Sequence, residues 1–345
     1  MTQPWIHKAK TDSMFILLPP FLVLTIVFFC QDWLTRLEAR YSFYTWLFLV
    51  VFIDVAHVYA TLFKTYFVPK TFNERKKLLV WLPVICFLIG LVLFMMGSKV
   101  FWITLAYIAV FHFIRQQYGF MRLYSRFEPK TKPNVFLDNL TIYAATGYPM
   151  LYWFMSPPRN YTWFMENEFF TYRNDVLLKV FGYLYVLILV IYLCKTLFAL
   201  LKTGYFNVPK NAVIIGTAAS WYFGIVYYNN DLVFTMLNIV SHGIPYMALI
   251  YLKEVEQKQL KKGEVSFLKF IGGYKAILLY VFILLLLAFF EEYLWEITVW
   301  NEQFSLSGSV VFSNWHFLLV PLLVVPQFTH YILDGFIWKT PKKAA

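Results

Sequence analysis

Long apolar runs separated by short polar segments dominate the chain from one end to the other. A helix needs about 20 mostly apolar residues to cross the hydrocarbon core of a bilayer, and the sequence contains ten runs of roughly that length. They cover residues 14–30, 42–63, 78–96, 99–118, 135–155, 176–198, 211–228, 231–252, 275–295 and 313–338. The pattern predicts an all-α, polytopic integral membrane helix bundle of about ten transmembrane helices, in a single transmembrane domain over residues 1–345.

The positions of the basic residues test this span count independently, because cytoplasmic loops carry an excess of Lys and Arg. With a cytoplasmic N-terminus, 23 of the 30 Lys and Arg residues fall in inner segments and five fall in outer segments. The outer segments are acidic instead, most clearly at Glu291, Glu292, Glu296 and Glu302. Because every second segment agrees, we expect both termini to be cytoplasmic.

Composition supports the same class of protein. Hydrophobic residues make up 60% of the chain and charged residues only 14%, against about 25% charged residues in soluble domains. The net charge of +11 follows the topology and favours contact with anionic membrane lipids, so we expect no nucleic-acid partner. Cys30, Cys86 and Cys194 lie in or beside apolar runs, which is typical of small hydrophobic residues. We expect a multi-pass protein of a bacterial inner membrane.

Four of the six histidines lie inside predicted spans, where ionisable side chains are costly and indicate a functional site. Each has a polar partner three or four residues away on the same helix face. The pairs are Asp54 with His57, His112 with Gln116, Asn238 with His242, and His330 with Asp334. Each of four helices is therefore expected to present one imidazole and one oxygen-bearing side chain together.

These four histidines are also predicted to lie at one depth in the membrane. All four spans run in the same direction, and His57, His112, His242 and His330 precede Lys64, Arg122, Lys253 and Lys339 by 7, 10, 11 and 9 positions. At 1.5 Å per residue the spread is only about 6 Å. We expect the four imidazoles to converge on a shared metal or cofactor site, as in other helix bundles. Hydrogen bonding between helices, the usual role of a single membrane histidine, is the alternative.

Four imidazoles and two carboxylates without thiolates suit iron, zinc, copper or manganese. If the histidines hold one ion, Asp54, Gln116, Asn238 and Asp334 accept hydrogen bonds from the other ring nitrogens. If Asp54 and Asp334 bind directly, the ligands suffice for two ions, and both carboxylates are catalytic candidates. Arg115 and Tyr118 flank His112. Arg115 either meets a phosphate or a redox partner's carboxylate or extends to the membrane surface.

The spread of His57, His112, His242 and His330 over separate spans resembles the histidine-ligated iron site of integral-membrane oxygenases, particularly the bacterial carotene-cleaving Brp/Blh type. It is more distantly similar to membrane desaturases and hydroxylases, although their HxxHH clusters are absent. The resemblance covers four helices and implies iron, dioxygen and a lipid or isoprenoid substrate. We therefore expect a metal-dependent membrane oxidoreductase, acting on a lipid-like substrate with an electron-donor protein on the cytoplasmic side.

Two other classes of protein stay open. A haem protein could use two of the histidines as axial ligands. A proton-coupled transporter could use the same aspartates and histidines as a relay, and the sequence Gly243-Ile244-Pro245 could interrupt one span. Against transport, the sequence shows no inverted repeat, and its intramembrane polar residues form one layer rather than a path.

Overall fold

The computed structural model describes residues 2–38, 43–156, 158–256, 273–300 and 313–338. Every regular element among these residues is a helix, which confirms the predicted all-α class. Eight described helical segments are long and apolar enough to cross a membrane, which suggests an integral membrane protein. They are Ala9–Phe29, Phe43–Phe63, Lys76–Met95, Ser98–Tyr124, Asp175–Thr203, Asp231–Glu256, Tyr274–Trp300 and His316–Ile337.

The two remaining predicted spans are also helical but are not among the eight. The run 135–155 lies in α9 (Lys132–Met155), which contains the buried Asp138. The run 211–228 lies in α11 (Val208–Trp221), which has only 14 residues and continues as the π-helical η4 (Tyr222–Tyr227). Several charges used to predict the topology lie outside the described residues: Arg40, Lys258, Lys261, Lys262, Lys269, Glu302, Lys339, Lys342 and Lys343.

The chain divides into two compact units. Unit one comprises Met1–Arg40 and Phe113–Pro245, and unit two comprises Tyr41–His112 and Tyr246–Ala345. The long helices α8 (Ser98–Tyr124) and α12 (Asp231–Ile250) contribute residues to both units. Two of the three boundaries therefore fall within helices, and the third, between Arg40 and Tyr41, lies outside the described residues.

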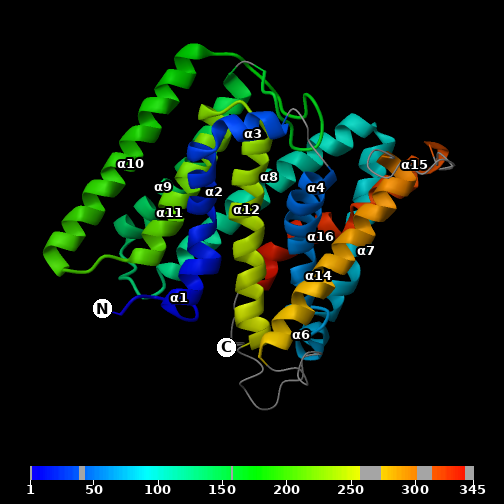
Figure 1. Cartoon of the computed structure of the whole chain (residues 1–345), viewed down its shortest axis with the longest axis horizontal. Helices are drawn as coiled ribbons and strands as arrows, with labels where there is room; N and C mark the ends of the chain where they lie inside the picture. The colour runs from blue at the N-terminus through cyan, green and yellow to red at the C-terminus, as the bar shows by residue number, and fades with distance from the viewer. Residues whose placement is uncertain (1, 39–42, 157, 257–272, 301–312, 339–345) are drawn as a thin grey trace. The chain divides into compact units, whose positions relative to one another are not determined.

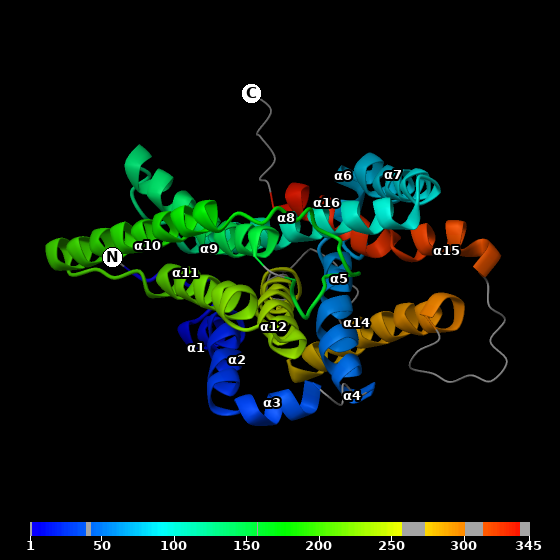
Figure 2. The ribbon, with the colours of Figure 1, turned by 90° about the horizontal axis from the view of Figure 1, so that it is seen from above.

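Unit one is built around α9. This helix packs against α10 (Asp175–Thr203), α11 and η4, and α11 packs against α2 (Leu18–Phe29), as Figures 1 and 2 show. Asn174 caps α10 by accepting a hydrogen bond from the Leu177 N–H at 3.0 Å, and Gly204 ends it at φ 64°, the left-handed conformation that glycine favours. The shorter helices of this unit are α1 (Ala9–Asp12), η1 (Ser13–Leu17) and α3 (Gln31–Glu38).

Unit two contains the most irregular span. This span begins with α4 (Phe43–Trp46), widens into the π-helical η2 (Leu47–Val55), continues as α5 (Ala56–Ala60) and tightens into the 3₁₀ helix η3 (Thr61–Phe63). The helix α14 (Tyr274–Trp295) packs against η2 and α5, while α15 (His316–Leu323) and α16 (Val325–Ile337) pack against α7 (Lys76–Met95). The other elements of this unit are α6 (Pro69–Glu74), η5 (Tyr251–Glu256), η6 (Glu296–Trp300) and η7 (Ser313–Trp315).

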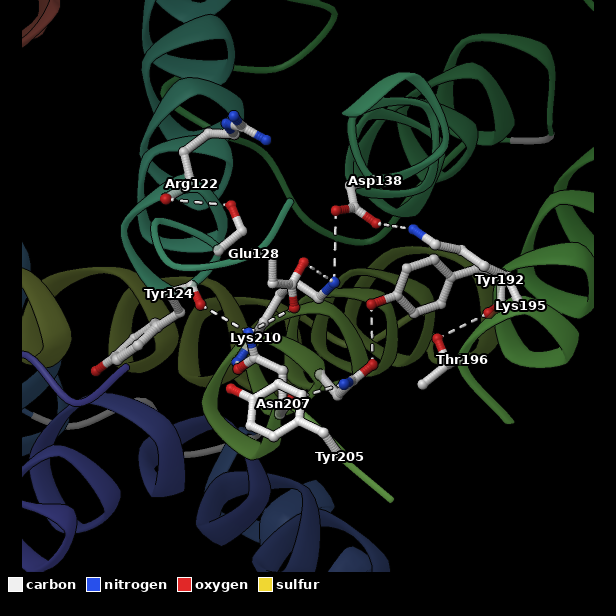
Figure 3. A network of polar contacts seen from close by, with 12 residues as sticks. Arg122, Tyr124, Glu128, Asp138, Tyr192, Lys195, Thr196, Tyr205, Asn207 and Lys210 are labelled. Carbon is white, nitrogen blue, oxygen red and sulfur yellow. Dashed lines mark hydrogen bonds and ion pairs between the residues drawn. The ribbon is translucent and has the colours of Figure 1, made fainter. Parts of the chain in front are cut away.

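A buried ion-pair network joins three helices of unit one (Figure 3). Lys210 of α11 lies 2.7 Å from a Glu128 oxygen and 3.4 Å from an Asp138 oxygen, and Lys195 of α10 lies 2.7 Å from the other Asp138 oxygen. Asn207 donates a hydrogen bond to Glu128 at 2.6 Å. Two ammonium groups face two carboxylates, so the network is electrically balanced and acts as a structural clamp.

Candidate metal centre

Three of the four predicted histidines come together in unit two. His57 of α5, His112 of α8 and His330 of α16 are each no more than 2% exposed. One ligand atom from each lies within 4.8 Å of the other two. The closest approach is 3.1 Å between the Nε2 atoms of His112 and His330. Three buried imidazoles on separate helices therefore face one small volume, an arrangement that could hold a metal ion.

A chain of hydroxyl groups leads away from His330. Its Nδ1 lies 2.7 Å from Thr61 Oγ1, which lies 3.1 Å from the Tyr246 hydroxyl oxygen. Tyr246 donates its hydroxyl proton to Asp334 at 3.0 Å. Its oxygen must therefore accept from Thr61, and Thr61 in turn accepts from the Nδ1–H group of His330. This order leaves the Nε2 lone pair of His330 directed at His112.

Asp334 is anchored beside the three histidines. Its Oδ1 also accepts a hydrogen bond from the Trp338 indole at 2.6 Å, and its Oδ2 lies 3.9 Å from His112 Nδ1. The sequence pairs Asp334 with His330 on one helix face, but Thr61 occupies the position beside His330 Nδ1. The Asp334 carboxylate instead lies near the Nδ1 atom of His112 and accepts hydrogen bonds from Tyr246 and Trp338. Its contact with His112 results from packing between helices.

The predicted pairing of Asp54 with His57 is present as a near contact. Asp54 Oδ1 lies 3.7 Å from His57 Nδ1, and the Asp54 side chain is half-buried. Both residues lie where the span changes from η2 to α5, just before η3 begins at Thr61. Short π-helical segments often occur at functional sites. Here the change of helix type lies next to Asp54, His57 and Thr61.

Glu291, Glu292 and Glu296 are buried in unit two, whereas the charge pattern assigned them to an outer loop. Glu291 and Glu292 belong to α14, and Glu296 begins η6. Glu291 accepts hydrogen bonds from the Tyr59 hydroxyl and from Gln327 Nε2, the latter at 3.4 Å. Tyr59 and Gln327 supply these donors from the helices that carry His57 and His330. In the sequence, acidic residues close together at the end of an apolar run indicated a loop. Their burial could not be predicted, because the donors that contact Glu291 are distant in sequence.

The fourth predicted ligand, His242, belongs to unit one, as do its predicted partner Asn238 and the predicted partner of His112, Gln116. Its buried ring stacks on Phe113 with centroids 3.6 Å apart. The Gln116 amide donates to the backbone carbonyl of His242 at 2.8 Å, and the Asn238 amide donates to the Phe234 carbonyl one turn earlier at 2.9 Å. Both amides thus donate to backbone carbonyls, where the sequence predicted that they would orient imidazoles. A ligand role for His242 stays a prediction.

Arg115 and Tyr118 also lie in unit one, where they pack together with Tyr143. The Arg115 guanidinium lies 4.5 Å from the centre of the Tyr118 ring and donates a hydrogen bond to the Tyr143 hydroxyl. The rings of Tyr118 and Tyr143 stack with centroids 5.4 Å apart. Cation–π contact and hydrogen bonding therefore hold Arg115 in place.

Comparison with known proteins gives no relative on which to rest a function. No protein-family model, no curated protein and no solved structure matches the chain. The functional argument therefore rests on this chain's own residues and on their geometry.

Proposed function

We propose that the protein is an integral membrane, metal-dependent oxidoreductase that uses iron and acts on a lipid or isoprenoid substrate. The observation that carries the proposal is the convergence of three buried imidazoles from three helices. The proposal keeps the resemblance to membrane iron oxygenases of the Brp/Blh type, and it includes a ten-span topology and a bacterial inner membrane location. Zinc, copper and manganese are the other metals that suit the same ligands.

The distance between the two closest ring nitrogens fits a shared metal ion. Metal–imidazole bonds measure about 2.0–2.1 Å. Two such ligands at the angles of an octahedral or tetrahedral site are then separated by about 2.8–3.4 Å. The Nε2 atoms of His112 and His330 are 3.1 Å apart, which lies within this range.

The protonation pattern supports the same conclusion. With the Nδ1 proton of His330 held by Thr61, its Nε2 offers a lone pair. Asp334, 3.9 Å from His112 Nδ1, favours a proton on that nitrogen and a second lone pair on His112 Nε2. A cation between these Nε2 atoms, which lie 3.1 Å apart, would bind both lone pairs. Metal-bound histidines usually have such hydrogen-bond partners behind them.

The residues of the chain would have distinct roles at such a site. Iron, when bound, would supply redox chemistry with dioxygen. His57, His112 and His330 would hold it, while Asp54 and Asp334 would hold protons beside the ring nitrogens. Burial of the three imidazoles would keep water away from reactive species, and an apolar substrate could enter from the bilayer. Electrons would come from a donor protein on the cytoplasmic side.

The geometry gives less support to haem. Two axial imidazoles lie on opposite sides of a haem iron, so their nitrogen atoms are about 4 Å apart at the bond lengths above. The 3.1 Å separation in this protein is too short for a porphyrin to lie between His112 and His330. A single compact ion fits the observed distance better.

A proton-coupled transporter is the second candidate, because one specific observation favours it. Buried polar groups extend beyond the histidines. Tyr246 and Asp334 continue the hydrogen-bond chain that begins at His330. Glu291 accepts hydrogen bonds from Tyr59 and Gln327, which belong to the helices that carry His57 and His330. The sequence predicted a single polar layer, and the additional buried carboxyl groups weaken that argument against transport.

Elemental analysis of the detergent-purified protein tests the main proposal. We expect about one equivalent of iron in the wild type and its loss in His57→Ala, His112→Ala and His330→Ala. The matched control is His316→Ala, since His316 pairs with the Thr298 carbonyl at 3.1 Å and lies outside the group. Equal iron in all four variants would refute the proposal. His242→Ala tests separately whether His242, the fourth predicted ligand, also binds iron.

The same preparations separate the two candidates. Glu291→Gln removes a buried carboxyl without touching a proposed ligand, so an oxidoreductase should retain its iron. If the protein is a proton-coupled transporter, Glu291→Gln should instead abolish pH-driven solute uptake into proteoliposomes. Metal-free wild-type protein after expression with ample iron, together with uptake abolished by Glu291→Gln, would replace the oxidoreductase with the transporter.

A further inference from the structure

Two arginines of α8 give unit one a positively charged helix face that the proposed metal centre does not use. Arg115 and Arg122 are seven residues apart in the sequence, so they lie two turns apart on the same face of the helix. Gly119 lies between them on that face, and a Cβ at Gly119 would meet no atom within 4 Å. The face therefore carries two cationic side chains on either side of a glycine that leaves open space.

Neutral groups hold Arg115 in position. Its side chain is exposed, it donates a hydrogen bond to the Tyr143 hydroxyl, and its guanidinium lies 4.5 Å from the centre of the Tyr118 ring. A guanidinium group has about five N–H donors, and the bond to Tyr143 uses one of them. The remaining donors have no acceptor among the residues that the structure describes, so they are available to an anion.

The carboxylates at this end of unit one are already neutralised. Glu128 and Asp138 pair with Lys195 and Lys210, and Figure 3 shows the Arg122 side chain directed away from both carboxylates. Within the described part of the chain, no carboxylate forms an ion pair with either arginine of the α8 face. A charge within a membrane span is costly unless it is paired. The two arginines therefore require an anion that the described residues do not supply.

The position of the two arginines along α8 favours a lipid headgroup as the source of that anion. Both lie in the segment Ser98–Tyr124, which is long and apolar enough to cross a membrane. The apolar run of this span is predicted to end at residue 118, three residues after Arg115 and four before Arg122. At 1.5 Å per residue, both are within about 6 Å of that end. This is the level of the lipid headgroups, where a membrane lipid has better access than a soluble protein.

The neighbouring helix α9 contributes an acceptor to the same region. Because residues 125–131 form a short connection, α8 and α9 run in opposite directions. Tyr143 of α9 contacts Arg115, so Asn139, one turn earlier on the same face of α9, lies opposite Gly119. The Oδ1 atom of Asn139 is buried and has no hydrogen-bond partner among the described residues. A ligand that fills the open space at Gly119 would therefore meet an acceptor as well as two cations.

We propose that Arg115 and Arg122 bind the phosphate of an anionic membrane phospholipid. Planar guanidinium groups match the geometry of phosphate oxygens, and basic pockets between helices on the cytoplasmic side bind anionic headgroups. A headgroup that carries hydroxyls, such as that of phosphatidylglycerol, also supplies a donor for Asn139. A zwitterionic lipid adds an ammonium group, which the two arginines repel. Recognition does not involve a metal ligand, so this proposal and the proposed metal centre can fail separately.

Titration of the full-length protein in maltoside micelles with phosphatidylglycerol, followed by native mass spectrometry, tests the proposal. We expect about one tightly bound phosphatidylglycerol per protein, and weaker binding of phosphatidylcholine. The variant Arg115→Gln/Arg122→Gln removes both charges. Its affinity should fall roughly 30-fold, since each basic residue near an anionic headgroup contributes about a factor of five.

A steric variant tests the site without changing its charge. Gly119→Leu places a side chain in the space that is open beside this glycine. Leucine is a better helix former than glycine, so the variant should fold. It should nevertheless lose phosphatidylglycerol, because its side chain occupies the position of the headgroup. Wild-type affinity in Gly119→Leu would overturn the proposed position of the lipid.

A matched variant distinguishes specific binding from general attraction to the membrane. Lys10→Gln/Lys202→Gln also removes two exposed positive charges of unit one, in α1 and α10, so it should bind phosphatidylglycerol like the wild type. Equal affinity in the two double variants would overturn the proposal, since the arginines would then only extend to the membrane surface. Calorimetric titration with inorganic phosphate distinguishes the sources of the anion. Saturable phosphate binding without bound phosphatidylglycerol would overturn the assignment to a lipid.

Discussion

Substitution of Lys210 by methionine is the sharpest test of the ion-pair network in unit one (Figure 3). The Lys210 side chain is 7% exposed and lies between carboxylates of Glu128 and Asp138, at 2.7 and 3.4 Å. Removing one partner of a buried ion pair costs about 3–5 kcal/mol. Asp138 retains Lys195 at 2.7 Å, and the Glu128 side chain is 21% exposed and can reach water. We therefore expect the lower end of that range, about 3 kcal/mol.

The double variant Lys210→Met/Asp138→Leu separates ionic coupling from loss of packing. It removes one charge of each sign and leaves Glu128 and Lys195, whose side chains are 21% and 24% exposed. Replacing both partners by apolar groups is often neutral or stabilising. We expect the double variant to be more stable than Lys210→Met, with a coupling free energy of at least about 2 kcal/mol.

Unfolding in mixed micelles of maltoside and dodecyl sulfate, followed by circular dichroism, measures both free energies. Arg173→Met is the control, because Arg173 and Asp175 form an exposed pair at 3.6 Å with side chains 69% and 66% exposed. Its loss should change stability by less than about 0.5 kcal/mol. A double variant that loses the sum of the two single effects would refute the interpretation, since the charges would then act independently.

Three further predictions follow from local geometry. Thr61→Val leaves His330 Nδ1 without its hydroxyl partner at 2.7 Å, so iron affinity, measured by competition with a chelator, should fall roughly 10- to 100-fold. Gly216→Val places a side chain where a Cβ would already meet Pro20 at 3.0 Å, so thermal unfolding should show a loss of about 1–3 kcal/mol. Burial raises the pKa of Glu168 above its ordinary 4.5, which favours its protonated form in the folded protein. Stability should therefore fall as pH rises from 4.5 through the raised value, and Glu168→Gln, compared in melting curves across pH, should flatten this dependence.

The helices could be predicted from the sequence because their signal is local. A run of about 20 apolar residues indicates a span without any knowledge of its neighbours, and the described residues of each of the ten predicted runs are mostly helical. The division into two units was not predicted. Two of its three boundaries fall inside α8 and α12, between His112 and Phe113 and between Pro245 and Tyr246, where the hydrophobic pattern does not change.

Convergence of His57, His112 and His330 could also be predicted, because spacing on a helix and depth in the membrane restrict where an imidazole points. Their hydrogen-bond partners could not. Thr61 lies 269 residues from His330 in sequence, and a threonine in a helix usually bonds a carbonyl one turn earlier. Only the packing of α16 beside α5 brings its hydroxyl to the ring.

Buried carboxylates are stabilised by a nearby positive charge. This requirement connects the two candidate functions, because either a metal ion or protons can supply the charge. Lys64 pairs with Glu254 at 2.5 Å, while Glu291 accepts hydrogen bonds from the neutral groups of Tyr59 and Gln327. An uncompensated charge inside a membrane protein is costly, so a carboxylate beside the histidines, such as Asp54 or Asp334, is stabilised by a proton or by a metal cation. A bound divalent ion would offset two negative charges and would be bound by the imidazole nitrogens of the same group. Metal-free protein would have to hold protons in the same place, so the absence of iron would itself predict proton uptake by this group.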